Sequence, residues 1–271
     1  MPELPEIETI RRGIAPHLLG RRVQHVVVRE ARLRWPVGED LSTRLVGQTV
    51  SAIGRRGKYL LIGMETGTLL VHLGMSGSLR ICPAGSSVRK HDHIDLVFDQ
   101  GTCLRLHDPR RFGCLLWTAD PPEHHPRLAG LGPEPLDAGF DGAYLHRLAA
   151  GRRSSVKSFL MDSRVVVGVG NIYANEALFR AGIHPRRPAG RIALVRYRRL
   201  AACITEVLLE AIQQGGTTLR DFVNESGTPG YFQQTLRVYG RADEPCVECG
   251  KPIRLIRVGQ RSTYYCGGCQ K

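Results

Sequence analysis

Apolar residues recur at helical spacing near the start of the chain. The stripe is formed by Ile7, Ile10, Ile14 and Leu18, which lie three or four residues apart. Pro5 stands where a first helical turn tolerates proline, and Gly20 follows the stripe as a stop signal. The pattern predicts a helix over residues 1–20, and the acidic Glu3 and Glu6 suit the positive end of its dipole. Both carboxylates fall off the apolar stripe, so we expect them to face a cleft or solvent.

The pattern changes to short strands between residues 23 and 118. Turn signals such as Glu65-Thr66-Gly67 separate six apolar or alternating segments, namely VQHVVVR, KYLLIGM, TLLVHLG, HIDLVF, TCLRLH and GCLLWT. Six or more strands at this spacing predict a sandwich or a barrel. Because no helix alternates with them, a parallel sheet is disfavoured.

Helical patterns follow a linker rich in proline and glycine over 119–136. Short helices are predicted at YLHRLAA and VKSFLMD, and a third over 172–181 with Asn171 as a plausible cap. A long amphipathic helix is predicted over 193–214. Residues 217–235 hold glycine, serine, asparagine and proline, which predicts a mobile loop in part of this stretch, and the tail over 237–271 reads as a hairpin-bearing module.

Composition and charge narrow the class of protein. The chain has 271 residues, enough for two domains and a small appendage. It lacks any apolar run long enough for a membrane span, and its acidic, proline-containing start is not a secretory signal. The charge balance of 38 − 25 = +13 favours a polyanionic partner, of which nucleic acid is the commonest. A basic protein without such a partner is the alternative.

The eight cysteines fall into two groups. Cys82, Cys103, Cys114 and Cys203 are scattered in apolar or mixed surroundings, which is typical of buried free thiols. The other four form two C-x2-C pairs in the tail and predict one structural zinc ion, because four thiolates leave no open position for water: Cys246, Cys249, Cys266 and Cys269. Two disulfides are the less favoured alternative.

The N-terminus carries a candidate nucleophile. Removal of Met1 would leave a secondary amine on Pro2, beside Glu3. A secondary amine that attacks C1′ of a sugar gives an iminium that cannot shed its charge by losing an N–H, which suits β-elimination. An α-amino group ionises at roughly pH 8, so a useful fraction is neutral without a buried lysine. The alternative is that PELPE is only a well-formed helix start.

Several motifs together resemble one family. The chain carries MPELPEIETIRRG, GKYLL, HLGMSGSLR, KHDH, DPRRFG, LGPEPL, VVGVGNIYANEALF, GIHP, QGGTTLRDF, GYF, VYGR and the cysteine-rich tail with QRSTYYC, in this order over nearly its whole length. This set resembles the formamidopyrimidine-DNA glycosylases, bacterial DNA-repair enzymes. The resemblance implies an α+β fold with an N-terminal helix and β-sandwich (1–130), a helix–two-turns–helix domain (131–236) and a C-terminal zinc finger (237–271).

The resemblance also implies roles for individual residues. Pro2 resembles the Schiff-base nucleophile, Glu3 the general acid and Lys58 the proton donor of β-elimination. Arg261 resembles the donor of δ-elimination and a phosphate ligand, and the phosphate role is favoured because a guanidinium is a poor acid at neutral pH. Further active-site carboxylates, with less defined roles, are Glu6 and Glu176.

DNA contacts are implied in the same way. Met75, Arg110 and Phe112 resemble a trio that fills the void left when a base rotates out of the stack; for a lone Met or Phe, core packing is the alternative. Residues that resemble or suit further DNA contacts are His91, Arg152, Arg153, Lys157, Asn171 and Tyr239.

We therefore expect a bifunctional DNA glycosylase and AP lyase that removes 8-oxoguanine and formamidopyrimidines, and a loop within 217–235 resembles the lid that closes over the flipped base. Two alternatives stay open: the sister endonuclease that acts on oxidised pyrimidines, and a non-catalytic zinc-finger protein that binds damaged DNA. The expected partner is damaged double-stranded DNA, with no membrane, and we expect a monomer in the bacterial cytoplasm, associated with the nucleoid while on DNA.

Overall fold

The computed structural model describes residues 2–215 and 236–271, and the predicted lid over 217–235 lies wholly outside them. Residues up to Ala129 form one compact unit, and residues 130–214 together with 236–271 form another. The cysteine-rich tail thus belongs to the same unit as the helices that precede it. The predicted division into three domains stays a prediction.

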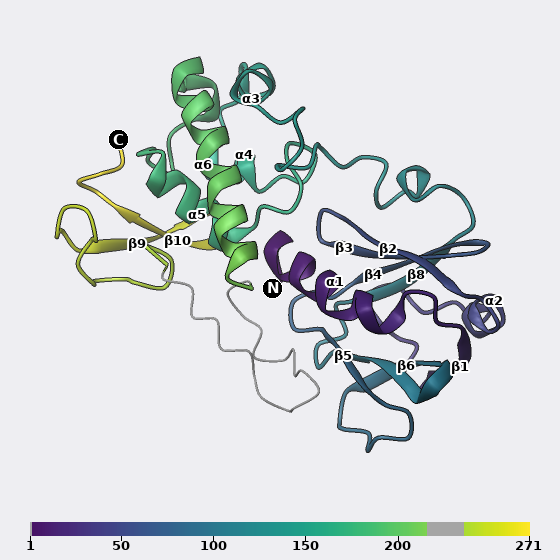
Figure 1. Cartoon of the computed structure of the whole chain (residues 1–271). Coiled ribbons are helices and arrows are strands. Elements are labelled where there is room, and N and C mark those ends of the chain that lie inside the picture. Colours follow the sequence, from purple (N-terminus) through teal and green to yellow (C-terminus); the bar gives the residue numbers. More distant parts are fainter. Residues whose placement is uncertain (1, 216–235) are drawn as a thin grey trace. The chain divides into compact units, whose positions relative to one another are not determined.

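The first unit contains two four-stranded antiparallel sheets (Figure 1). One has the order β1-β6-β7-β5 and the other the order β2-β3-β4-β8. Helix α1 (Leu4–Leu18) packs against β2, β3 and β5. The strands and the short helix α2 are β1 (Val23–Val28), α2 (Leu41–Leu45), β2 (Val50–Arg56), β3 (Tyr59–Met64), β4 (Gly67–His72), β5 (Ser78–Pro83), β6 (Asp92–Phe98), β7 (Thr102–His107) and β8 (Cys114–Thr118).

One apolar core joins α1 and both sheets, which confirms the predicted sandwich with its N-terminal helix. The predicted stripe supplies the helix side of this core: Ile7, Ile10, Ile14 and Leu18 are all buried. Two strands, β2 and β5, were not among the six predicted segments. β2 contains Gly54 and ends in two arginines, and β5 ends in Pro83, so neither shows an uninterrupted apolar or alternating pattern.

The second unit consists of helices and one hairpin (Figure 1). Helix α6 packs against α3 and α5, and α5 packs in turn against β10. The bounds are α3 (Gly142–Ala149), α4 (Val156–Leu160), α5 (Asn171–Arg180), α6 (Leu194–Gln213), β9 (Ile253–Val258) and β10 (Arg261–Cys266). Single-turn 3₁₀ helices lie at Asp99–Gly101, Pro122–His124 and Ala189–Arg191. The four α-helices and the hairpin match the predicted patterns, and the ends of the helices differ from the predicted ends by at most two residues.

Helix α5 begins one residue earlier than predicted. Gly170 is the N-cap, and Asn171 is the first helical residue rather than the cap. Gly168, just before, has a φ of 80°, which a residue with a side chain rarely adopts. Within the described residues, no helix is both long and apolar enough to cross a membrane.

Candidate functional site

The first turn of α1 holds the residues predicted to carry the chemistry. Glu3 is the N-cap, and its backbone N–H donates to the Glu6 carboxylate over 2.8 Å in a capping box. Glu3 and Glu6 are each 2% exposed, whereas Pro2 is partly exposed. Of the two expected surroundings, a cleft or solvent, burial excludes solvent, because the capping box turns Glu6 back onto the helix start. The result is a pair of buried carboxylates next to the residue whose amine would react.

The Glu8 carboxylate lies among three arginines and helps to fix the orientation of α1. Glu8 accepts hydrogen bonds from Arg11 over 2.7 Å and from Arg12 over 2.8 Å, and Arg55 of β2 lies 3.5 Å away. Burial opposes the charge of Glu8, but these arginines more than compensate and lower its pKa to about 2. Glu8 is therefore ionised at every physiological pH, and its ion pair with Arg55 ties the helix to β2.

Lys58 lies in the two-residue turn between β2 and β3, just before the strand at whose start it was expected. Arg56 and Tyr59 pair across this turn, and Gly57 has a φ of 56°. Tight hairpins commonly place a glycine with positive φ at the first turn position. The turn therefore holds the Lys58 backbone rigidly at the tip of a hairpin.

His72, at the end of β4, was not singled out from the sequence although it belongs to the HLGMSGSLR motif. Its Nδ1 accepts a hydrogen bond from the Gly74 N–H over 2.9 Å, and its ring lies 4.7 Å from that of Tyr59. Burial, followed by the charges of Lys58 and Arg34, lowers the pKa of His72 to about 4. The imidazole is thus neutral at pH 7 and lies near enough to Lys58 to be influenced by its charge.

The neutral state of His72 gives a testable pH dependence. In the unfolded chain its pKa is the ordinary 6.5, so the unfolded state binds the proton first and stability falls as the pH drops from 6.5 towards 4. His72→Asn keeps an acceptor near the Nδ1 position but does not titrate. We expect its thermal midpoint to fall less than that of the wild type between pH 7 and pH 4.5.

Thermal melts at the two pH values measure this difference. His25→Asn, which removes an exposed imidazole from β1, is the matched control and should follow the wild type. Equal losses of midpoint in the wild type and in His72→Asn would contradict the assignment.

The predicted void-filling residues lie on two loops of the first unit. Arg110 and Phe112 are exposed, Phe112 by 40%, and the Arg110 guanidinium lies over the Phe112 ring at 4.7 Å. Met75 is partly exposed on the loop between β4 and β5. A Cβ on Gly74 would lie 2.4 Å from the backbone of Phe112, so the two loops touch and leave no room for a side chain. This arrangement does not match the alternative of core packing for Phe112.

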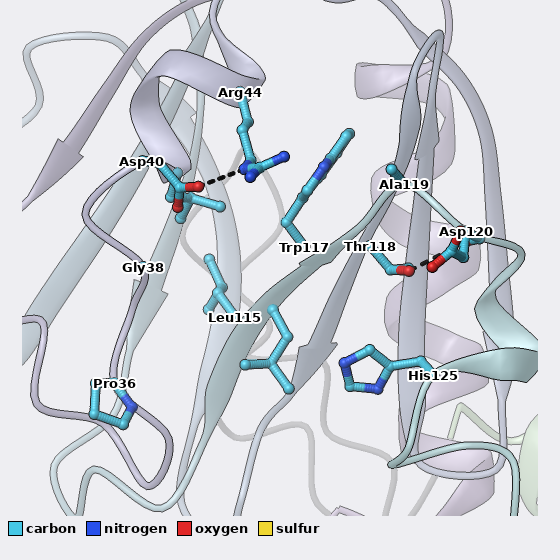
Figure 2. A pocket seen from close by; sticks show the side chains of 12 residues that line it. Pro36, Gly38, Asp40, Arg44, Leu115, Trp117, Thr118, Ala119, Asp120 and His125 are labelled. Atoms are coloured by element: carbon cyan, nitrogen blue, oxygen red, sulfur yellow. Dashed lines mark hydrogen bonds and ion pairs between the residues drawn. The ribbon is translucent and has the colours of Figure 1, made fainter.

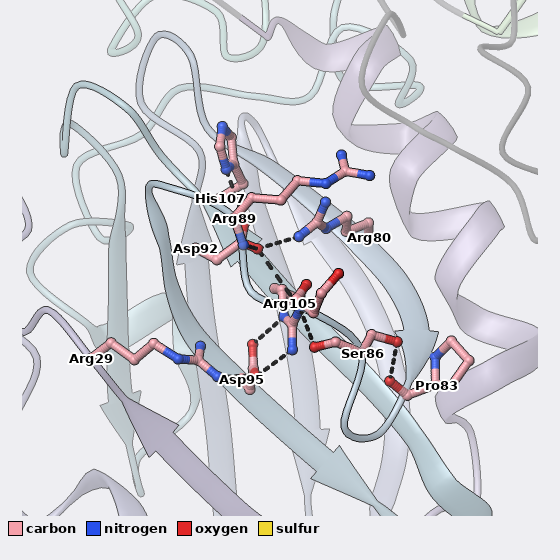
Figure 3. Close-up of polar contacts among 10 residues, drawn as sticks. Arg29, Arg80, Pro83, Ser86, Arg89, Asp92, Asp95, Arg105 and His107 are labelled. Atoms are coloured by element: carbon pink, nitrogen blue, oxygen red, sulfur yellow. Dashed lines mark hydrogen bonds and ion pairs between the residues drawn. The ribbon is translucent and has the colours of Figure 1, made fainter.

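A buried charge network holds the loop that leads to His91 (Figure 3). Arg105 is bound by both oxygens of Asp95, at 2.7 and 2.8 Å, and its Nη1 also donates to the backbone oxygens of Ser86 and Ser87. Asp92 accepts the Arg89 backbone N–H over 2.8 Å and the His107 ring N–H over 2.9 Å. The outer face of the sheet therefore anchors the segment over 84–91 at several points.

The second unit carries the other predicted DNA contacts. Arg152 and Arg153 are exposed just before α4. Asn171 opens α5, and its side-chain oxygen is buried without a hydrogen-bond partner among the described residues. The helix N-terminus itself favours an anion, whereas the amide oxygen is an acceptor and would be satisfied only by a hydrogen-bond donor.

Glu176, which the resemblance implied as a further active-site carboxylate, is buried and bound by backbone N–H groups. Its two oxygens accept the backbone N–H groups of Arg237, Val238 and Tyr239, at 2.9, 3.0 and 2.8 Å. Glu176 thus fixes the segment that carries Tyr239. The side chain of Tyr239 packs edge-on against Tyr264 at 5.1 Å, which orients its ring.

Lys157 is fully buried rather than displayed towards a phosphate. Its ammonium donates to the backbone oxygen of Ser262 over 2.9 Å and to Thr263 Oγ1 over 2.7 Å. Arg261, exposed at the start of β10, directly precedes Ser262 in the chain. The contacts of Lys157 therefore hold the backbone from which Arg261 projects.

The tail cysteines form the predicted metal centre. All four sulfur atoms lie within 4.8 Å of one another, with Cys246 and Cys269 3.8 Å apart and Cys249 and Cys266 3.4 Å apart. Thiolates around a tetrahedral zinc at about 2.3 Å would lie about 3.8 Å apart. All eight cysteines are free, so the alternative of two disulfides is wrong. The donor set fits one structural zinc ion.

A pocket of about 450 Å³ lies elsewhere on the first unit, beside the edge strand β8 (Figure 2). Its walls include Trp117, His125 and the ion pair between Arg44 and Asp40. None of the predicted site residues lines it, so its position does not coincide with the candidate chemistry. Within the first unit the structure instead gathers Met75 and Phe112 on touching loops.

Comparisons with known proteins agree with the motifs. Family models match the formamidopyrimidine-DNA glycosylase N-terminal domain over 1–115, the H2TH domain of the same enzyme over 131–223, and a zinc finger found in FPG and IleRS over 243–271. The formamidopyrimidine-DNA glycosylase of Methylococcus capsulatus is 70% identical over 271 residues and that of Alkalilimnicola ehrlichii 61% identical over 277, each covering 100% of both chains.

Solved structures give the same result. The MutM (Fpg) protein of Thermus thermophilus has a TM-score of 0.87 at 40% identity and covers 99% of this chain and 98% of its own. Lactococcus lactis Fpg (MutM) in complex with DNA containing Fapy-dG has a TM-score of 0.89 at 32% identity, with 99% and 100% covered.

Proposed function

The chain belongs to the formamidopyrimidine-DNA glycosylase family, and from this premise we propose how its own residues carry out the reaction. The protein is a base excision repair glycosylase that acts on oxidised purines in damaged double-stranded DNA, and its AP lyase activity is consistent with the family. The observation that supports the chemistry best is the first turn of α1, where Pro2 stands beside the buried Glu3 and Glu6.

The first step proposed is attack of the Pro2 nitrogen on C1′ of the damaged nucleotide. The N–C1′ bond forms as the glycosidic bond to the base breaks, and the Pro2 nitrogen gives up its proton. The C1′–O4′ bond then breaks and opens the sugar ring, with a proton from Glu3 assisting departure of the base or accepted by O4′. The product is an iminium ion between Pro2 and the sugar. Because Pro2 is a secondary amine, this ion has no N–H proton to lose and stays an electron sink.

The strand-cleaving steps follow from the iminium. It makes the C2′ proton acidic, and loss of this proton expels the 3′ phosphate in β-elimination. A second elimination expels the 5′ phosphate and leaves a one-nucleoside gap with phosphate ends. Lys58, held in its hairpin turn, is proposed as the proton donor of the first elimination, and Arg261 as a phosphate ligand near the second.

DNA binding is assigned to exposed groups on both units. Phe112 would wedge between bases, Met75 would occupy the vacated space and Arg110 would hydrogen-bond the unpaired base. Contacts with the sugar–phosphate backbone of the DNA are proposed for Asn171, Tyr239 and His91. Arg152 and Arg153, both exposed, are proposed to bind phosphates. Lys157 is better assigned to positioning the hairpin, since its ammonium is buried.

Location follows from the substrate. Chromosomal DNA is the source of oxidised purines, and the relatives above are bacterial. We therefore place the enzyme at the nucleoid of a bacterial cytoplasm, working as a monomer.

Borohydride trapping tests the proposed function against both alternatives. Zinc-loaded protein whose Met1 has been removed is incubated with duplexes that contain 8-oxoguanine opposite C or thymine glycol, in the presence of cyanoborohydride. We expect a covalent adduct at the N-terminal peptide and faster reaction with 8-oxoguanine. Preference for thymine glycol would favour the pyrimidine enzyme, and binding without any adduct would favour a non-catalytic sensor.

A further inference from the structure

Asp108 lies at the point where three loops of the first unit meet. The residue is fully buried, and its carboxylate accepts the Gly113 N–H over 2.8 Å, the Arg110 N–H over 3.3 Å and the Ser76 hydroxyl over 3.4 Å. Gly113 and Arg110 belong to the turn that displays Phe112, and Ser76 follows Met75. One side chain thus joins the two loops that carry the proposed void-filling residues.

The backbone of Asp108 adds the third loop. Its N–H donates to the His91 carbonyl over 3.0 Å, and its carbonyl accepts a hydrogen bond from His93 Nε2 over 2.9 Å. The segment that displays His91 is therefore fixed to the same residue.

The surrounding backbone is crowded and partly strained. A Cβ on Gly113 would lie 2.7 Å from the His72 carbonyl and 3.1 Å from the Asp108 carboxylate. His91 and Arg111 have φ values of 74° and 55°, in the left-handed region that non-glycine residues seldom adopt. Such conformations persist only where surrounding contacts determine them, and the bonds to Asp108 supply such contacts.

We infer that Asp108 is a positioning residue for base extrusion, which holds the Met75, His91 and Arg110–Phe112 segments as one rigid group. This inference rests on the proposed function. A wedge that replaces an extruded base must be in place as the base leaves, and displacement of such a group by about 1 Å can cost about 100-fold in rate. The hydrogen bonds of Asp108 fix loops whose tips are exposed, and they do not hold the apolar core together.

Two assays separate this role from a general loss of stability. Release of 8-oxoguanine from duplex DNA requires extrusion of a base, whereas cleavage of a preformed abasic site does not. We expect Asp108→Ala to slow base release by about 10- to 100-fold while abasic-site cleavage changes by less than about threefold. Asp108→Asn keeps one acceptor and should lie between this variant and the wild type, and Ser76→Ala should have the smallest effect.

Gln48→Ala is the matched control. Gln48 is buried, and its side chain accepts the Thr66 N–H over 3.0 Å in the turn that precedes β4, at the opposite end of this strand from the Met75 loop. It should lower the thermal midpoint without a selective loss of base release. The inference is overturned if the Asp108 variants release base at the wild-type rate, or if base release and abasic-site cleavage fall by the same factor. Failure of the wild type to release 8-oxoguanine would instead overturn the proposed function.

Discussion

Pro2→Gly is expected to lose most of the ability to release 8-oxoguanine, by on the order of 10³-fold. Glycine leaves a primary amine, and the iminium formed from it can lose its N–H proton to become a neutral imine, which is a weak electron sink. Glycine also loosens the backbone just before the N-cap Glu3, so the amine is less well placed. Single-turnover release of base, with intact mass to confirm removal of Met1, measures the loss.

Pro16→Gly is unsuitable as the control because it would weaken the helix, so Pro16→Ala is the better choice. Pro16 is exposed in the last turn of the same helix, far along α1 from the proposed chemistry. This variant should release base at the wild-type rate. Full activity in Pro2→Gly, or in protein that retains Met1, would refute Pro2 as the nucleophile.

Local patterns carried most of what the sequence could predict. The apolar stripe of α1 is visible because helical residues three and four apart share a face, and the zinc site is visible because each C-x2-C pair is contiguous. The exposure of Arg110 and Phe112 also agrees with local features, namely a turn that starts with Pro109 and contains two arginines. Each of these features needs only neighbouring residues to be recognised.

Features that depend on distant partners were not predicted. Lys157 reads as one more basic residue near a helix start, yet its partner Thr263 lies 106 residues further along the chain. The local sequence around Glu176 does not show that its carboxylate is bound, because the N–H groups that it accepts lie 61 to 63 residues away. Nothing in the local pattern indicates such contacts. A basic or acidic residue therefore has the same sequence signature whether it binds DNA or holds the fold.

Asp108 and His72 show an intermediate case. Both lie inside family motifs, DPRRFG and HLGMSGSLR, so the sequence indicates that these segments matter for function. Their functions depend on which loops the two sheets bring together, such as the contact between Gly74 and Phe112. The motif can locate such residues, but only the tertiary structure shows what they touch.

Cys246→Ser is expected to weaken binding to damaged duplex DNA by on the order of 100-fold or more, because zinc supplies most of the folding energy of its module, about 10–16 kcal/mol in isolated fingers. The apolar cluster of this module is small: its buried members are Phe179, Val238, Cys246, Ile253 and Cys266. Without the metal it cannot hold β9 and β10 in register. Arg261 would then lose its fixed position, and the basic tail could no longer be held against phosphates.

Cys203→Ser is the matched control for this last prediction. Cys203 is a buried thiol of α6 in the same unit but lies outside the metal-ligand set. Both variants lose one thiol, but only Cys246→Ser loses a metal ligand. We therefore expect zinc content and DNA affinity to fall together in Cys246→Ser and to stay at wild-type values in Cys203→Ser. Zinc content by mass spectrometry and binding by fluorescence anisotropy, at one fixed salt concentration because phosphate contacts are salt-dependent, measure the two effects. If Cys246→Ser loses zinc yet binds DNA as tightly as Cys203→Ser, the contacts of Glu176 and Lys157 are sufficient to hold the hairpin, and the metal is not what positions Arg261.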